Sequence, residues 1–155
     1  MTPEETRDRI VRIFTMRRTY TTREVANILK IDLEVLHAEI EARDIAVVRG
    51  EARNLPWVEV AYLALRTWPL QMIFDALGPR ASSYLPELLR PTNVTVTLPG
   101  YQVRMLEVLA RDQELDVSTF LQLHLLDLAS AESAFLGEEI FGFLAAFHFP
   151  FGEGR

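Results

Sequence analysis

The most regular run of polar side chains in the sequence alternates with apolar ones. The polar members are Asn93, Thr95 and Thr97, and the apolar members are Val94, Val96 and Leu98. A period of two is typical of a strand that buries one face. The polar side chains are therefore expected to stand together on the other face, where amide and hydroxyl groups donate and accept hydrogen bonds.

The residue types that most often carry catalysis or metal binding are scarce and scattered. The chain has no cysteine, and His37, His124 and His148 lie far apart, without a nucleophile pattern or a glycine-rich phosphate loop. His124 falls on an apolar helical stretch and is expected to be a packed residue. We therefore expect no enzyme activity, no metal site and no bound cofactor.

The composition is that of a folded protein that stays inside the cell. Of the 155 residues, 49% are hydrophobic and 25% are charged, which suits one domain or two small ones. Residues 1–14 lack the apolar stretch of a signal peptide, and no stretch approaches the roughly 18 uncharged apolar residues of a membrane span. We therefore expect a cytoplasmic protein without a membrane segment.

The charge of the chain is unevenly distributed. The formal net charge of -6 counts against a generic nucleic-acid binder, because lysine and arginine neutralise the phosphate backbone. Residues 1–30 nevertheless carry seven Lys and Arg against four Asp and Glu, whereas residues 93–155 carry three against nine. Any electrostatic attraction to DNA is therefore expected from the beginning of the chain.

One strand followed by two helices is predicted for residues 93–130. Pro99 and Gly100 end the strand, and apolar residues then recur at helical spacing over Tyr101–Ala110 and after the capping residue Asp116. A lone strand leaves its backbone groups unpaired, and no second strand of similar quality lies nearby. We therefore expect an antiparallel ribbon with the same strand of a second copy. The expected dimer core consists of Val94, Val96, Leu98 and Leu106.

This layout resembles the ribbon-helix-helix repressors of the Arc and MetJ type and the DNA-binding half of many bacterial antitoxins. In that family, alternate strand residues read base edges in the major groove. The resemblance implies that Asn93, Thr95 and Thr97 read DNA, since asparagine pairs with adenine and threonine offers a hydroxyl or a methyl group. Here the strand lacks arginine and lysine, and the second helix begins Glu114-Leu115-Asp116. The alternative is a ribbon that serves dimerisation alone.

A helix-turn-helix is predicted in the first part of the chain. Thr21-x-x-Glu24 is a capping box that opens a helix over Arg23–Leu29. The tight turn Lys30-Ile31-Asp32 leads into a second helix, Leu33–Ala42. The remaining predictions here are an amphipathic helix over Arg7–Met16, a small wing over residues 46–51, and helices over Trp57–Arg66 and Pro69–Leu77.

The run Tyr-Thr-Thr-Arg-Glu-Val-Ala-Asn-Ile-Leu-Lys-Ile-Asp resembles the start of the MerR-like and excisionase-like winged-helix families. The likeness covers about residues 20–65. The candidate recognition helix exposes Glu34 and Glu41, and carboxylates face mostly hydrogen-bond acceptors in the major groove. DNA contacts are therefore expected from Arg17, Arg18, Arg23 and Lys30. The alternative is that these cations only form a solvated face.

The end of the chain is unusually rich in phenylalanine, at Phe141, Phe143, Phe147, Phe149 and Phe151. A helix is predicted over Glu138–Phe147, and Pro150 cannot continue it. Two interpretations remain open. The rings pack on the chain's own domains or across the dimer, or they bind a partner protein, as the toxin-binding segment of similar antitoxins does.

The sequence thus predicts a mainly α protein in four parts. These are a winged helix-turn-helix-like domain (1–79), a connector (80–92), a ribbon-helix-helix unit (93–130) and an aromatic C-terminal segment (131–155). We expect a homodimeric transcriptional regulator, an antitoxin-like autorepressor that binds double-stranded operator DNA and holds a cognate toxin. The alternative is an assembly module that neutralises or scaffolds a partner protein without binding DNA.

Overall fold

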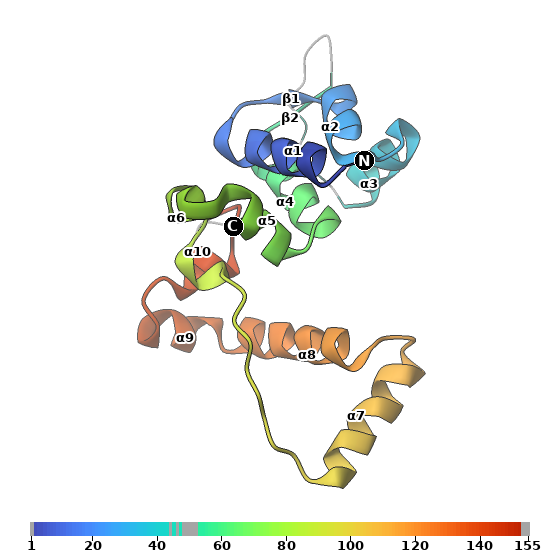
Figure 1. The fold of residues 1–155 in the computed structure, drawn as a ribbon, viewed down its shortest axis with the longest axis vertical. Helices are drawn as coiled ribbons and strands as arrows, with labels where there is room; N and C mark the ends of the chain where they lie inside the picture. The colour runs from blue at the N-terminus through green and yellow to red at the C-terminus, as the bar shows by residue number, and fades with distance from the viewer. Residues whose placement is uncertain (1, 44, 46, 48–52, 153–155) are drawn as a thin grey trace.

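The computed structural model describes residues 2–43, 45, 47 and 53–152 (Figure 1). The predicted mainly α fold is confirmed. Within these ranges the strands are β1 (Tyr20–Thr21) and β2 (Asn54–Leu55), which pair antiparallel with Tyr20 opposite Leu55. The predicted wing lies outside the described residues, except for Val47. No helix in the described ranges is both long and apolar enough to cross a bilayer.

The described residues between 2 and 89 form an N-terminal lobe with its own core. Its helices are α1 (Pro3–Thr15), α2 (Thr22–Leu29), α3 (Leu33–Ala42), α4 (Trp57–Thr67), α5 (Leu70–Leu77) and α6 (Ala81–Tyr84), with 3-10 turns η1 (Gly78–Arg80) and η2 (Glu87–Leu89). The helix α1 packs on α4 and α5. Side chains from most of these elements are completely buried, among them Ile10, Phe14, Tyr20, Leu36, Leu55, Val60 and Ile73.

Hydrogen bonds between near neighbours fix the start of α2 and of α3, the two helices that the sequence predicted as a helix-turn-helix. The Thr21 hydroxyl accepts from the Glu24 backbone N–H at 3.2 Å, and the Glu24 carboxylate accepts from the Thr21 N–H at 2.9 Å. This confirms the predicted capping box. Lys30 ends α2 in a left-handed conformation (φ 57°), and the Asp32 carboxylate accepts from the Glu34 N–H at 2.8 Å to start α3. The sharp turn between α2 and α3 therefore has a local cause.

Four helices follow the connector. They are α7 (Gly100–Asp112), α8 (Val117–Ala131), α9 (Ser133–Glu139) and α10 (Phe143–Phe147). The prediction of one helix over Glu138–Phe147 is wrong, because α9 ends at Glu139 and α10 begins at Phe143. Gly142 between them has a φ of 81°, a left-handed conformation that glycine adopts without a steric penalty.

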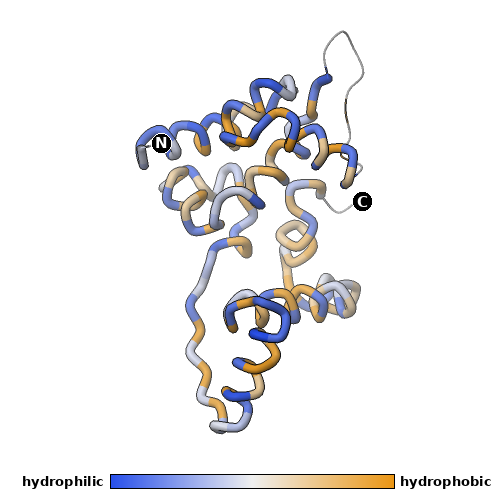
Figure 2. Tube along the Cα trace, turned by 90° about the vertical axis from the view of Figure 1, so that its right-hand side faces the viewer, coloured by the Kyte–Doolittle hydropathy of each residue, from blue (hydrophilic) through white to orange (hydrophobic). Residues whose placement is uncertain are grey.

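Residues 93–98, which we call the ribbon segment, run as an elongated trace from η2 toward α7 (Figure 1). Figure 2 shows the same segment standing apart from α8. All six residues are exposed, and Val94 and Val96 keep 78% and 65% of their surface in solvent. They make no hydrogen bond to any other described residue. The predicted strand is therefore not formed in the single chain, where the segment is extended but has no strand partner among the described residues.

The helices α7 and α8 contact each other but form almost no core. Of residues 93–131, only Ala110 and Phe120 are buried, whereas apolar residues run along both helices (Figure 2). The exposed large apolar side chains include Val103, Met105, Val108, Leu109, Leu121, Leu123, Leu125, Leu126 and Leu128. A helix that is apolar on most sides is normally covered. We call residues 93–131 the ribbon unit. Within a single chain, nothing buries the apolar side chains of this unit.

Candidate nucleic-acid interface

The three predicted base-reading side chains are accessible. Asn93, Thr95 and Thr97 are all exposed, and none has a hydrogen-bond partner in the described part of the chain. Their amide and hydroxyl groups are therefore available to a ligand. The alternating neighbours Val94, Val96 and Leu98 are exposed as well, so the single chain does not distinguish an inner face from an outer face.

The start of α8 is occupied by a carboxylate. Asp116 accepts from the backbone N–H of Thr119 at 2.9 Å and from its hydroxyl at 2.7 Å. The hydroxyl bond first, and then the backbone bond, hold the pKa of Asp116 below its ordinary value, so the group is ionised. A phosphate approaching the N–H groups at this end of α8 would meet this negative charge.

Arg17, one of the predicted DNA contacts, is engaged with the lobe itself. Its guanidinium lies 4.4 Å from the centre of the Trp57 ring and donates to the Tyr84 backbone carbonyl at 2.7 Å. Stacking over an aromatic face and a hydrogen bond to a carbonyl both fix the orientation of the group. The side chain thus has a structural role, although it remains solvent accessible.

Arg18, the next predicted contact, is engaged in a similar way. It forms an ion pair with Glu24 at 2.8 Å, and its guanidinium lies 4.1 Å from the centre of the Tyr20 ring. The hydrogen bond from Arg18, together with that from the Thr21 backbone, lowers the pKa of Glu24 to about 2. The pair therefore connects residue 18 to the capping box of α2.

The substitution Glu24→Gln tests this connection. Because glutamine can still cap α2, the change removes mainly the charge, and we expect the free energy of unfolding at pH 7 to fall by about 0.5–1 kcal/mol, as for a partly exposed ion pair. The folded-state pKa of Glu24 is depressed from 4.5 to about 2. Its contribution is therefore present above pH 4.5 and lost as the pH falls toward 2.

Urea denaturation of the wild type and the variant across this pH range measures the effect. Glu41→Gln is the matched control, since the Glu41 side chain is 74% exposed and lies 4.0 Å from Arg53. If the free energies of unfolding of the wild type and Glu24→Gln differ by the same amount at pH 7 and at pH 2, the effect does not come from the charge of Glu24.

Arg23 and Lys30 are the predicted contacts that the fold leaves available. Both are exposed, and neither side chain forms an ion pair or hydrogen bond with another described residue. Arg23 shares a groove of about 460 Å³ with Arg53, and the other lining residues are Thr21, Thr22, Leu33 and His37. Sequence reasoning missed Arg53, because it follows the predicted wing and lies outside the two helices. Its nearness to Arg23 depends on the pairing of β1 with β2.

The exposed surface of α3 is acidic. Glu34 and Glu41 are exposed, with Val35 and Ala38 between them, and Glu39 forms an ion pair with Arg43. Carboxylates find few donors in the major groove and are repelled by the phosphates. Positive charge in this region therefore lies at the start of α2 and beside β2, while the exposed face of α3 carries negative charge.

The phenylalanines of the C-terminal segment have different surroundings. The Phe149 ring lies 6.2 Å from the Trp57 ring, and the Phe151 ring lies 5.6 Å from the Tyr62 ring. Phe143 and Phe147 stack on each other with ring centres 5.6 Å apart, and Phe141 is completely exposed. The last two rings thus pack on the chain's own N-terminal lobe, while Phe141 is available to a partner.

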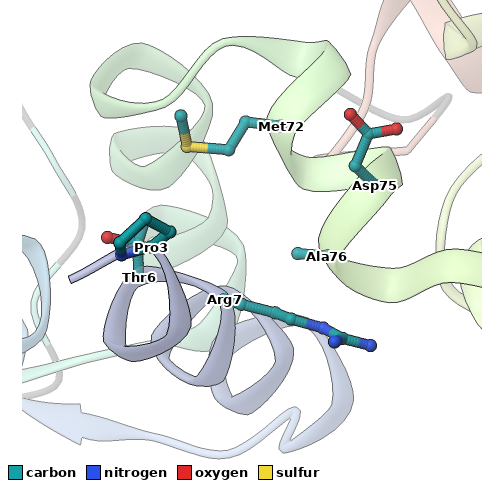
Figure 3. Close-up of a pocket in the computed structure, with 6 residues that line it drawn as sticks. All are labelled: Pro3, Thr6, Arg7, Met72, Asp75 and Ala76. Carbon is teal, nitrogen blue, oxygen red and sulfur yellow. The ribbon is translucent and has the colours of Figure 1, made fainter.

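A pocket that the sequence did not indicate lies between α1 and α5 (Figure 3). It has a volume of about 530 Å³ and is lined by Pro3, Thr6, Arg7, Met72, Asp75 and Ala76. Figure 3 shows Pro3 and Met72 near one end, with Arg7 and Asp75 near the other. The part of the chain that the structure describes holds no cluster of three or more metal-binding side chains. The pocket places the charged side chains of Arg7 and Asp75 on the same lining as the apolar Pro3 and Met72.

Comparison with models of protein families, with curated proteins and with solved structures gives no match for this chain.

Proposed function

We propose that the chain is a homodimeric DNA-binding regulator whose two copies join through the ribbon unit. The observation that carries the proposal is the ribbon segment, which is extended, exposed and without a partner among the described residues. Pairing two such segments antiparallel would satisfy their backbone groups. It would also place Val94, Val96 and Leu98 of both copies over the uncovered helices.

The exposed apolar side chains supply the free energy for this association. Complete burial of a valine or leucine side chain contributes about 1.5–3 kcal/mol. Val94 and Leu98 are 78% and 39% exposed, and Leu125 on α8 is 62% exposed. In a two-fold dimer each of these side chains occurs in both copies, so its burial contributes twice. Several such groups offset an association cost of about 4–15 kcal/mol.

The polar side of the ribbon would then be the DNA-reading surface. With the valines turned inward, Asn93, Thr95 and Thr97 of each copy would point outward together, because side chains alternate along a strand. Two copies related by a two-fold axis would read a palindromic operator. Arg23 and Lys30, whose side chains form no ion pair or hydrogen bond in the described part of the chain, would add attraction to phosphate.

Binding of the purified chain to the DNA upstream of its own coding sequence tests the proposal. We expect binding that weakens as salt rises, because the released counterions favour the complex. Asn93→Ala and Thr95→Ala should each abolish preference for the operator, at a cost of about 1–3 kcal/mol for a lost base contact, without changing the dimer mass. Footprinting and light scattering measure the two quantities.

Thr92→Ala is the matched control for these substitutions. Thr92 is also an exposed threonine, but it lies just before the ribbon segment and donates to the Arg90 carbonyl at 3.4 Å. Its removal should leave the footprint unchanged. An unchanged footprint for Asn93→Ala and Thr95→Ala would mean that the ribbon does not read DNA.

A second candidate function is an assembly module that dimerises and holds a partner protein without binding DNA. Two observations favour this second function. Arg17 and Arg18 are engaged within the lobe, and the ionised Asp116 at the start of α8 would repel phosphate. An intact dimer that binds no DNA even at low salt would support this second function and exclude the first.

A further inference from the structure

We propose that the N-terminal lobe carries a binding site for an aromatic–proline–aromatic peptide, which the chain's own residues 148–152 occupy reversibly. We call these residues the tail. The side chains that form the tail site are Arg17, Trp57, Tyr62 and Tyr84. The inference concerns a different surface from the ribbon and does not depend on DNA binding.

The tail site is organised by the lobe itself. The Trp57 indole N–H donates to the Ile13 carbonyl at 2.8 Å, which fixes the ring on the end of α1. Arg17 covers the same ring at 4.4 Å and donates to the Tyr84 carbonyl at 2.7 Å. Neither bond involves the tail. The site can therefore keep its shape when the tail leaves.

The tail fits this site through both of its phenylalanines. The Phe149 ring meets Trp57 edge to face, with an angle of 73° between the rings, and Phe151 lies against Tyr62. Edge-to-face and tilted ring pairs are favourable because the edge of one ring is positive and the face of the other is negative. Pro150 between them is buried. The lobe therefore contacts all three residues of the Phe-Pro-Phe sequence.

The segment that carries the tail is weakly anchored. No residue from 121 to 149 is buried, although α9, α10 and most of α8 lie in this range. Beside the tail, a cavity of about 370 Å³ is lined by residues that include Ser82, Ser83 and Pro86. Segments with few buried apolar contacts open locally at a much lower free energy than the whole fold. Opening of the tail therefore need not disturb the core of the lobe.

The docked tail also connects the two halves of the molecule. In Figure 1 the chain leaves α9 and passes through α10 beside η2, and Phe149 and Phe151 then lie against Trp57 and Tyr62 of the N-terminal lobe. A protein that captured Phe149 and Phe151 would have to remove them from the tail site and would release this connection. Release of this connection depends on the proposed partner protein, whereas the existence of the tail site does not.

A peptide titration of the full chain tests the site. In the variant Phe149→Ala/Phe151→Ala the site is vacated, and we expect a peptide with the sequence of residues 147–152 to bind it at least about tenfold more tightly than it binds the wild type. The reporter is the NMR signal of the Trp57 indole N–H, with the Trp68 indole as an internal reference. A peptide in which the residues that correspond to Phe149 and Phe151 are replaced by alanine should not bind.

The matched control variant is Phe135→Ala/Phe141→Ala. These rings are 59% and 102% exposed, so this change removes two phenylalanines but leaves the tail in place. It should bind the peptide no better than the wild type does. The proposal is overturned if the folded Phe149→Ala/Phe151→Ala variant binds no peptide, or binds it only as well as the wild type does.

Hydrogen exchange of the wild-type chain tests reversibility without any substitution. The Phe149 and Phe151 N–H groups donate to the carbonyls of Ala146 and His148. We expect these amides to exchange at least about a hundredfold faster than the amides of α1 and α4, because local opening exposes them. Exchange as slow as that of α1 and α4 would show that the tail is a permanent part of the lobe and would overturn the proposal.

Discussion

Replacement of Val96 by aspartate is expected to abolish the dimer and unfold residues 93–131, while the N-terminal lobe stays folded. Val96 is 65% exposed in the single chain, but in a ribbon it would lie in the shared core. Burying an unpaired carboxylate there costs several kcal/mol, and two-fold symmetry introduces the cost twice. The lobe should survive because its core contains no residue of the ribbon unit. Light scattering measures the mass, and circular dichroism measures the lost helix.

Thr97→Asp is the matched control for this substitution. It adds the same charge one residue further along the strand, where the period of two turns the side chain to the opposite face. This variant should remain a dimer, although its DNA binding should be lost by charge repulsion. A soluble Val96→Asp monomer with α7 and α8 intact would contradict a ribbon shared between two copies.

The second large effect is expected from Phe14→Ala in the N-terminal lobe. Phe14 has no exposed surface and lies in α1 within the core. Truncation to alanine leaves a cavity, and we expect the free energy of unfolding of the lobe to fall by about 3–5 kcal/mol. The fluorescence of Trp57 and Trp68 reports this transition selectively, since these are the two tryptophans of the chain and both lie in the lobe.

Phe135→Ala provides the control for Phe14→Ala. Its ring is 59% exposed, so we expect a change of less than about 0.5 kcal/mol in the same denaturation experiment. The dimer formed by the ribbon unit should persist in both variants. If Phe14→Ala dissociates the dimer at the same denaturant concentration at which it unfolds the lobe, the two parts do not fold independently.

Both large effects follow from the uneven distribution of buried surface. The N-terminal lobe buries side chains from α1 to α6, whereas the ribbon unit buries only Ala110 and Phe120. A segment with so little core depends on contacts from outside the single chain. The stability of residues 93–131 should therefore depend on protein concentration, whereas that of the lobe should not.

The sequence predicted local structure well where the deciding groups are a few residues apart. The helix over Leu33–Ala42 has the predicted bounds, and the capping box of Thr21 and Glu24 forms as predicted. Each depends on hydrogen bonds between near neighbours, which a sequence pattern reports directly. The helix expected over Glu138–Phe147 is interrupted at Ile140, which is extended, and at Gly142, which is left-handed, and apolar periodicity reveals neither.

Contacts between distant residues were beyond the reach of the sequence. Arg17 donates to the Tyr84 carbonyl, 67 residues away, and Phe149 packs on Trp57. These pairs exist because the folded lobe brings α1, α4 and α6 together and the C-terminal segment returns to them. The spacing of residues along the chain does not predict such contacts.

The sequence by itself determined the short-range features, namely the capping box of Thr21 and Glu24 and the bounds of the helix Leu33–Ala42. The alternation over residues 93–98 predicts two faces, because side-chain direction along a strand follows residue order alone, but the single chain forms no strand there. Only the tertiary structure decided which predicted cations stay available. It engages Arg17 and Arg18 with aromatic rings and leaves Arg23 and Lys30 exposed, since the surroundings of a charge depend on elements distant in sequence.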